Sequence, residues 1–185
     1  MELFRLLSIS MDLHGPILLV EDNDDDAFFF EKAVQRLGVS LKVERVVDGP
    51  QAVEYLMKQI ESSPPGMLQA PAMVMLDLKL PRMDGFEVLE WIRHHEALKN
   101  LRVNILSSSG EEADRLRASY LKADAYLVKP VAIEDYYLMV KQIWEQWLLP
   151  TLTSAPESRP SVSSDGRTSE QSSIPVPLNP PSPSQ

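Results

Sequence analysis

Short apolar runs alternate with stretches of helical periodicity between Pro16 and Leu149, and this alternation constrains the fold more than any other feature. Short apolar runs are typical of strands buried on both faces of a parallel sheet. The predicted strands are Ile17–Val20, Leu41–Val47, Ala72–Leu76, Leu101–Leu106 and Ala125–Val128. The predicted helices are Asp24–Leu37, 49–61, a segment from Gly85 to about His95, 111–122 and 133–148.

Five strand–helix units in about 135 residues predict a single α/β domain over residues 15–149. Crossovers between parallel strands are right-handed, so the helices are expected on both faces of an open, doubly wound parallel sheet. Such a sheet binds ligands at the carboxyl ends of its strands, beside the switch in strand order. The residues at those ends are therefore the candidates for function.

The two ends of the chain do not continue this alternation. Residues 150–185 hold eight of the fifteen prolines together with ten serines, and their few aliphatic side chains are isolated from one another. We expect them to form a disordered tail, because they cannot bury enough apolar surface to offset chain entropy. Residues 1–14 contain no apolar run near the ~20 residues needed to span a bilayer and no signal-peptide pattern, so a flexible leader is expected.

The composition excludes several classes of function. The chain has 27 acidic and 18 basic side chains and a net charge of −9, which argues against nucleic acid as a direct partner. It has no cysteine, which excludes disulfides, thiolate zinc sites and thiol catalysis and suits a cytoplasmic location. No second apolar pattern follows Leu149, so we expect the output to pass through another molecule.

The ends of the predicted strands carry three carboxylates, hydroxyls and an ammonium group: Glu21, Asp22, Asp77, Ser107, Ser108 and Lys129. Two like charges 4 Å apart repel by about 4 kcal/mol at an effective dielectric near 20. We therefore expect that one carboxyl is protonated or that a divalent cation lies among them. Oxygen ligands without Cys or His favour Mg²⁺ or Mn²⁺.

This set of groups is suited to phosphoryl transfer. The reaction needs in-line positioning and neutralisation of the phosphoryl oxygens, and it needs little else from a protein. A carboxylate nucleophile, a metal ion, a lysine and a hydroxyl supply these requirements, and Asp forms aspartyl phosphates in other proteins.

The sequence resembles the receiver domain of two-component response regulators over roughly residues 15–149. The matching motifs are Ile17–Asn23 (ILLVEDN), Val74–Pro81 (VMLDLKLP) followed by Asp84 and Gly85, and Val128–Pro130 (VKP). The resemblance implies a flavodoxin-like (βα)5 fold with strand order 2-1-3-4-5. Residues 26–30 (DAFFF) and 144–148 (WEQWL) are similar to the single-domain regulators paired with cyanobacterial phytochromes.

The resemblance also implies a metal site and a phosphoacceptor. Asp77 would accept a phosphoryl group from a phosphohistidine on a partner kinase. The protein would not be an enzyme in the usual sense, because it would catalyse only its own phosphorylation and dephosphorylation. Asp22 and Asp77 would bind Mg²⁺ directly, Lys79 would contribute its backbone carbonyl, and Glu21 would act through water.

Three more roles follow from the same resemblance. Lys129 would pair with a phosphoryl oxygen, and its peptide bond to Pro130 would be cis. Ser107 corresponds to the switch hydroxyl that moves toward the phosphoryl group, and Tyr126 to the aromatic switch. Ser108 and Ser109 are expected to be loop residues only, and Asp24–Asp26 to cap the first helix.

Two alternatives remain open. A haloacid-dehalogenase-like phosphatase also uses a strand-end Asp, but it would want a second Asp two residues later, where this chain has Lys79. A pseudo-receiver would bind partners without phosphorylation, but such domains typically lose the acceptor or the lysine, and both are present here.

The last helix and one residue of the fourth strand suggest self-association. Residues 133, 137, 140, 144 and 147 form a stripe that we expect to pack on the sheet, with Tyr136, Met139 and Ile143 widening the apolar surface beside it. Asn104 lies within the fourth strand and is expected to face an interface or a polar neighbour. These features predict a homodimer through the region of strand 4 and helix 5, residues 101–106 and 133–148.

Overall fold

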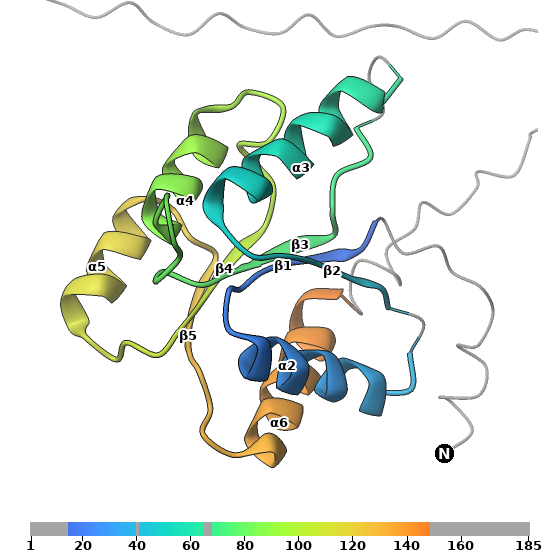
Figure 1. Cartoon of the computed structure of the whole chain (residues 1–185), viewed down its shortest axis with the longest axis vertical. Coiled ribbons are helices and arrows are strands. Elements are labelled where there is room, and N and C mark those ends of the chain that lie inside the picture. The colour runs from blue at the N-terminus through green and yellow to red at the C-terminus, as the bar shows by residue number, and fades with distance from the viewer. Residues whose placement is uncertain (1–14, 40, 65–67, 149–185) are drawn as a thin grey trace, which may run out of the picture. The chain divides into compact units, whose positions relative to one another are not determined.

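The five predicted strands pair in parallel in the order β2-β1-β3-β4-β5, which confirms the predicted sheet (Figure 1). The computed structural model describes residues 15–39, 41–64 and 68–148, so the predicted leader and tail lie outside the described residues. The strands are β1 (Ile17–Val20), β2 (Val43–Val46), β3 (Met73–Leu76), β4 (Val103–Ser107) and β5 (Ala125–Val128). The helices are α2 (Asp24–Arg36), α3 (Gly49–Ser62), α4 (Gly85–His94), α5 (Glu112–Tyr120), α6 (Ile133–Ile143) and the π-helix η1 (Trp144–Leu148).

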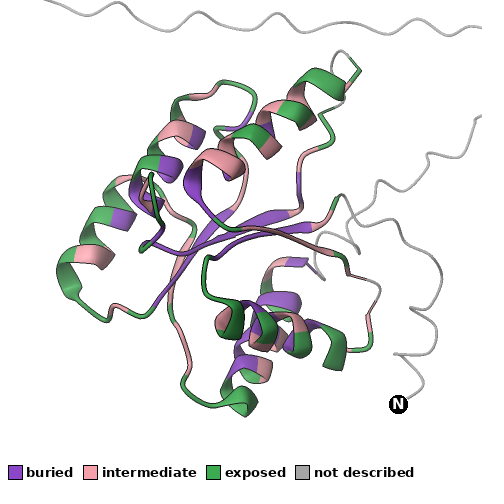
Figure 2. Ribbon diagram, in the orientation of Figure 1, coloured by how far each residue is buried: buried purple, intermediate pink, exposed green. Residues whose placement is uncertain are grey.

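Helices cover both faces of the sheet, α2 and α6 on one face and α3, α4 and α5 on the other (Figure 1). Successive side chains of a strand point to opposite faces, so each central strand contributes to two cores. Leu18 and Val20 of β1 pack with the α3–α4–α5 face, and Ile17 and Leu19 pack with the α2–α6 face. The central strands β1, β3 and β4 are buried throughout (Figure 2).

The switch in strand order lies between β1 and β3. The chain leaves β1 toward β2 on one side and later returns to place β3 on the other, with Val20 paired to Leu76. The residues that follow these two strands, Glu21 and Asp77, are therefore neighbours at the carboxyl edge of the sheet. A ligand site is expected at this position of a doubly wound fold.

The stripe predicted for the last helix is confirmed in part: Val140 and Trp144 are buried, and Tyr137 and Trp147 pack against the same core. The buried residues of α6 are Tyr136, Met139, Val140 and Ile143, whereas Ile133 is 40% exposed. The helix carries two overlapping apolar stripes, and α6 packs against α2 as well as the sheet. Tyr136, Met139 and Ile143 are therefore core residues and do not provide the extra apolar surface on which the predicted dimer was based.

Asn104 does not face an interface, contrary to the prediction. It is fully buried, because β4 lies between β3 and β5. Its Nδ2 atom lies 3.7 Å from Sδ of Met73 and 3.8 Å from Sδ of Met75, and its Oδ1 has no hydrogen-bond partner among the described residues. The amide thus lies inside the α2–α6 core against weak acceptors.

None of the helices in the described ranges is long and apolar enough to cross a membrane.

Candidate functional site

Three carboxylates predicted at strand ends lie together at the carboxyl edge of the sheet. The backbone of Glu21 is held by the carbonyl of Val46 at 3.0 Å and that of Asp77 by the carbonyl of Val20 at 3.0 Å. Glu21 and Asp77 are buried and Asp22 is exposed, and one oxygen from each carboxylate lies within 4.8 Å of the others. Sheet pairing therefore assembles a cluster of oxygen donors that is open on one side.

This donor set fits a hard divalent cation. Three carboxylates with no Cys or His among the clustered groups match the ligand preference of Mg²⁺ or Mn²⁺. The backbone N–H of Lys79 donates to Oδ1 of Asp77 at 3.3 Å, so the loop after β3 is folded against the Asp77 carboxylate. A metal-binding role for the Lys79 carbonyl stays a prediction.

The ammonium group of Lys129 lies among three carboxylates. Its Nζ is 2.7 Å from Oε2 of Glu21, 2.9 Å from Oδ2 of Asp26 and 2.8 Å from Oδ2 of Asp77. The side chain is 7% exposed, and the backbone N–H of Lys129 donates to the Ser107 carbonyl at 2.8 Å. The structure thus brings Lys129 to Asp77 across 52 residues of sequence.

The predicted cis bond between Lys129 and Pro130 is wrong, since the described residues contain no cis peptide bond. The two isomers of an X–Pro bond differ by only about 0.5–1 kcal/mol in the absence of tertiary contacts, so local sequence does not determine which is present.

Burial and ion pairing oppose each other in this cluster. Burial would lower the pKa of Lys129, but its hydrogen bonds to Asp77, Glu21 and Asp26 outweigh burial and raise the pKa above its ordinary value. Burial raises the pKa of Glu21 to about 7, although the hydrogen bond and charge of Lys129 oppose that rise. Protonation of Glu21 is therefore one way in which the cluster relieves its repulsion, and a bound cation is the other.

Sequence reasoning missed the position of Asp26. The cap of α2 is Asn23, whose Oδ1 accepts from the backbone of Asp25 at 2.9 Å and Asp26 at 3.0 Å. The Asp26 carboxylate instead reaches Lys129. Its spacing was a usable signal, because Asp26 precedes the fully buried Phe30 by four residues and so shares its face of the helix.

Ser107 and Tyr126 form a second part of the site through Ser109. Ser107 is the buried last residue of β4, and its Oγ accepts from the Ser109 N–H at 3.2 Å. The Tyr126 hydroxyl donates to the Ser109 carbonyl at 2.9 Å, and the Ser109 hydroxyl donates to Asp114 at 2.6 Å. Ser109 therefore connects β4, β5 and α5, beyond the loop role that was predicted for it.

A pocket of about 330 Å³ lies beside this second part, and its lining includes Lys79, Ser107 and Arg117. Gly85 shapes the neighbouring loop. Its N–H donates to the Leu78 carbonyl at 3.0 Å, and a Cβ atom at Gly85 would lie 2.1 Å from the Asp77 carbonyl oxygen. Glycine is thus required where α4 begins against the loop that contains Asp77.

Residues 17–141 match the family described as the response regulator receiver domain. The chain belongs to the response regulator receiver family. This receiver domain is 39% identical to the "Probable methanogenesis regulatory protein FilR2" of Methanothrix harundinacea over 71% of the chain and 83% of that protein. It is 33% identical to the "Response regulator Rcp1" of a Synechocystis strain over 71% of the chain and 88% of Rcp1.

Solved structures give the same family. The receiver domain superposes on the phosphorylated cyanobacterial phytochrome response regulator RcpA with a TM-score of 0.65 at 34% identity, covering 73% of this chain and 94% of RcpA. The Mn²⁺-bound form of Rcp1 gives a TM-score of 0.63 at 32% identity, covering 72% of this chain and 94% of Rcp1. The predicted similarity to phytochrome-associated regulators is confirmed.

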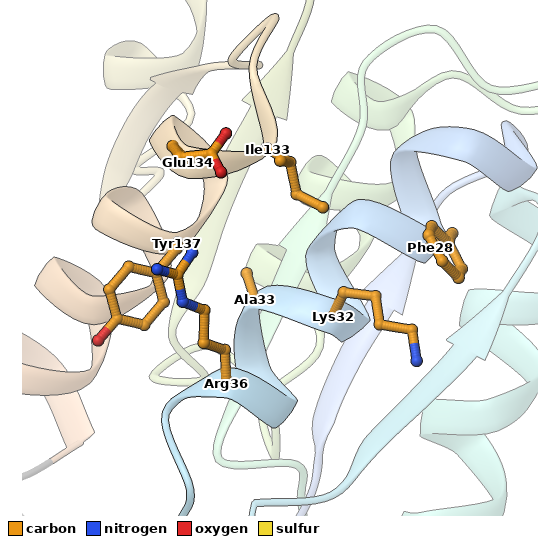
Figure 3. A pocket seen from close by; sticks show the side chains of 7 residues that line it. All are labelled: Phe28, Lys32, Ala33, Arg36, Ile133, Glu134 and Tyr137. Carbon is orange, nitrogen blue, oxygen red and sulfur yellow. The ribbon is translucent and has the colours of Figure 1, made fainter.

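A groove of about 250 Å³ lies between α2 and α6 of this receiver domain (Figure 3). Its lining is apolar with basic and acidic side chains at the rim: Phe28, Lys32, Ala33, Arg36, Ile133, Glu134 and Tyr137. Phe28 is 51% exposed, with the Lys32 ammonium 5.4 Å from its ring centroid, and the Arg36 guanidinium lies 4.3 Å from the ring centroid of Tyr137. Phe28, the first residue of α2 in this lining, is two residues after Asp26.

Proposed function

We propose that this receiver domain is a response regulator that accepts a phosphoryl group onto Asp77 from a histidine kinase. The observation that carries the proposal is the placement of Asp77, whose Oδ2 lies 2.8 Å from Lys129 while its carboxylate clusters with Glu21 and Asp22. This is a carboxylate nucleophile beside a fixed positive charge and a set of metal donors.

In the proposed reaction a carboxylate oxygen of Asp77 attacks the phosphorus of the kinase phosphohistidine. A new P–O bond forms as the P–N bond breaks, and its electron pair returns to the imidazole. The Lys129 ammonium faces the phosphoryl oxygens and offsets part of their charge. A divalent ion held by Asp22 and Asp77, with Glu21 acting through water, would neutralise further charge and help align the groups. The domain would act on itself and on no separate substrate.

Ser107 and Tyr126 are proposed to carry the signal away from Asp77. A phosphoryl group attracts the Ser107 hydroxyl, which now accepts from the Ser109 N–H. Ser109 also accepts from the Tyr126 hydroxyl, so movement at Ser107 changes the support of that ring. One new covalent charge would thus shift a two-state element at α5 and β5, which then binds another protein or passes the phosphoryl group along a relay.

The identity of the kinase is proposed from the relatives. RcpA is described as a phytochrome response regulator, and we extend a phytochrome partner to this chain. FilR2, at 39% identity, is described as a regulator of methanogenesis, so the family likeness alone does not select the kinase. Phosphotransfer from a panel of purified histidine kinases, with a phytochrome kinase among them, tests this. Preferential transfer from a non-phytochrome kinase would contradict the proposed pairing.

The groove between α2 and α6 is proposed as the surface that meets the kinase. Asp26 lies in the first turn of α2, and α6 follows shortly after Lys129, so a partner seated in the groove reaches the acidic edge. We expect Phe28→Ala to slow transfer from the cognate kinase without slowing labelling by acetyl phosphate. An equal loss of rate in both reactions would indicate that Phe28 supports the fold and does not contribute to kinase docking.

Self-association is proposed with a revised surface. β4 is buried and offers no face, so the proposed homodimer moves from the predicted region to α5, the edge strand β5 and the loop before α6. Exposed apolar residues occur there, with Leu116 62% and Tyr120 85% exposed and Val131 fully exposed. Sedimentation that finds only monomer at tens of micromolar, with and without a phosphoryl analogue, would contradict this proposal.

The main test is labelling with a small phosphodonor. Incubation with Mg²⁺ and acetyl phosphate should add one base-labile phosphate per chain, and mass spectrometry should find it on Asp77. Asp77→Asn should abolish the adduct, and chelation of the metal should suppress it. Many turnovers of the donor per chain would favour a phosphatase, and a folded protein that forms no adduct would favour a phosphorylation-independent binding module.

A further inference from the structure

Asp26 differs from the other two carboxylates that contact Lys129. The three N–H donors of a lysine ammonium are matched here by Glu21, Asp26 and Asp77. Glu21 and Asp77 belong to the cluster that can hold a cation, together with Asp22. Asp26 is outside that cluster. Of the three partners of Lys129, it is the one that a bound metal ion does not share.

Asp26 is itself held in place from the opposite helix. The hydroxyl of Tyr136 donates to Oδ1 of Asp26 at 3.1 Å, while Oδ2 of the same carboxylate contacts Lys129 at 2.9 Å. Tyr136 is fully buried in the α2–α6 core, so its ring cannot move aside without disturbing that core. The two oxygens of Asp26 are therefore assigned to different partners, which fixes the direction in which Oδ2 points.

We propose that Asp26, oriented by Tyr136, is a positioning residue that anchors Lys129 at the border of the metal cluster. The inference deepens the proposed phosphoacceptor function of Asp77 and rests on it. When a cation is bound among Glu21, Asp22 and Asp77, the Lys129 ammonium still has one strong acceptor that does not bind the metal. That acceptor is Asp26. Lys129 is then kept beside the phosphoryl position without occupying the metal site.

The consequence of removing this anchor follows from the charges. Without Asp26, the ammonium retains Glu21 and Asp77 alone, and both are groups that the cation also needs. A buried ammonium and a divalent ion repel each other strongly in a site of low dielectric. Lys129 and the metal would then compete for the same oxygens, so metal affinity should fall and the lysine should lose its fixed position.

The simpler alternative is that Asp26 contributes only one more negative charge near the metal. Asp25 provides the matched control. It is adjacent in the same turn of α2, it is exposed, and within the described part of the chain its side chain contacts neither Lys129 nor Tyr136. Asp25→Asn therefore makes the same change in net charge without removing the anchor. Tyr136→Phe provides the complementary control, because it removes the orienting hydroxyl and leaves every charge in place.

The experiment measures Mg²⁺ binding to the full chain by calorimetry at fixed ionic strength. Asp26→Asn should weaken binding by roughly tenfold, the lower end of the effect of losing an outer-sphere partner. Asp25→Asn should change affinity by less than about twofold, as expected for an exposed charge. Tyr136→Phe should weaken binding by roughly threefold, in the same direction as Asp26→Asn, because it removes one hydrogen bond and no charge. Equal effects of Asp26→Asn and Asp25→Asn, or wild-type affinity in Tyr136→Phe, would overturn the proposal.

A second measurement reports the position of Lys129 directly. The protected ammonium resonance of Lys129, assigned by its loss in Lys129→Arg, should be present in the Mg²⁺-bound wild-type protein and in Asp25→Asn, and absent in Asp26→Asn. Persistence of that resonance in Asp26→Asn would also overturn the proposal. Neither measurement requires phosphorylation, so failure of Asp77 to take a phosphoryl group would be recognised separately by acetyl phosphate labelling.

Discussion

The helices α5 and α6 precede and follow the same edge strand, β5, yet they bury very different numbers of side chains. Within α5, all of which is described, Ala118 is the buried residue. α6 buries Tyr136, Met139, Val140 and Ile143, and Tyr136 also bonds to Asp26 in α2. Each helix follows a site residue, α5 after Ser107 and α6 after Lys129.

The site thus combines a strongly packed part, called here the fixed part, with a weakly packed part that we propose is movable. The part beside α6 places Lys129 against three carboxylates and is locked by a buried aromatic ring. The part beside α5 depends on the contacts of Ser109 and on cation–π stacking of Arg115 on Tyr126 at 4.9 Å and Arg117 on Phe86 at 4.1 Å. Arg117 is exposed and Arg115 is half-buried. Cation–π contacts near the surface contribute about 0.5–1 kcal/mol each, so α5 can shift at lower cost than α6.

The largest expected effect is on stability, and it tests whether the two helices differ as described. Tyr136→Ala removes a fully buried ring and its hydrogen bond, and it should lower the free energy of unfolding by about 3–5 kcal/mol. Leu116→Ala in α5, at 62% exposure, should change it by no more than about 0.5 kcal/mol. Urea denaturation measures both. Similar losses in the two variants would remove the distinction.

The next effect concerns the charge of the fixed part in metal-free protein. Burial raises the pKa of Glu21 to about 7 from 4.5, so the stability that Glu21 contributes is present below pH 4.5 and is lost as the pH rises through 7. The loss is on the order of 3 kcal/mol. Urea unfolding with chelator at pH 5 and pH 8 should therefore show a larger fall for wild type than for Glu21→Gln. Parallel falls in the two proteins would contradict the assignment.

Hydrogen exchange tests the comparison without mutation. Amides of α5 should exchange at least about tenfold faster than those in the middle of α6, because few apolar contacts of α5 must break for local opening. Addition of Mg²⁺ and a phosphoryl analogue should change exchange in residues 107–120 more than in 133–143. The reverse distribution would show that α6 is the element that moves.

The smallest expected effect concerns the contact of Arg115 with Tyr126 in the movable part. Arg115→Gln removes the cation over Tyr126 and should lower the free energy of unfolding by less than about 1 kcal/mol. Its effect on the Tyr126 ring should be clearer, seen as a change in ring NMR shifts before phosphorylation. Arg117→Gln, which removes the stacking on Phe86 instead, is the control and should leave those shifts unchanged.

The sequence by itself determined the elements, the order of layers and the members of the acidic cluster. Strand and helix periods are local properties, and a residue that directly follows a buried parallel strand must lie at the carboxyl edge of the sheet. Glu21, Asp22, Asp77 and Lys129 were predicted together for this reason, and the family motifs added their individual roles. The fourth strand ends at Ser107, one residue later than predicted, because Ser107 pairs with Val128.

Tertiary structure decided what depends on contacts between distant elements. Two apolar stripes overlap on α6, and packing against both α2 and the sheet buries Tyr136 completely while it leaves Ile133 exposed. This packing brings Tyr136 to Asp26 across 110 residues and makes an apparent capping acid a partner of Lys129. Ser109 and Asn104 acquire their contacts in the same way, from neighbouring strands. Local periodicity fixes which residues share a face, but the free energy that orients the face comes from packing between elements far apart in the chain.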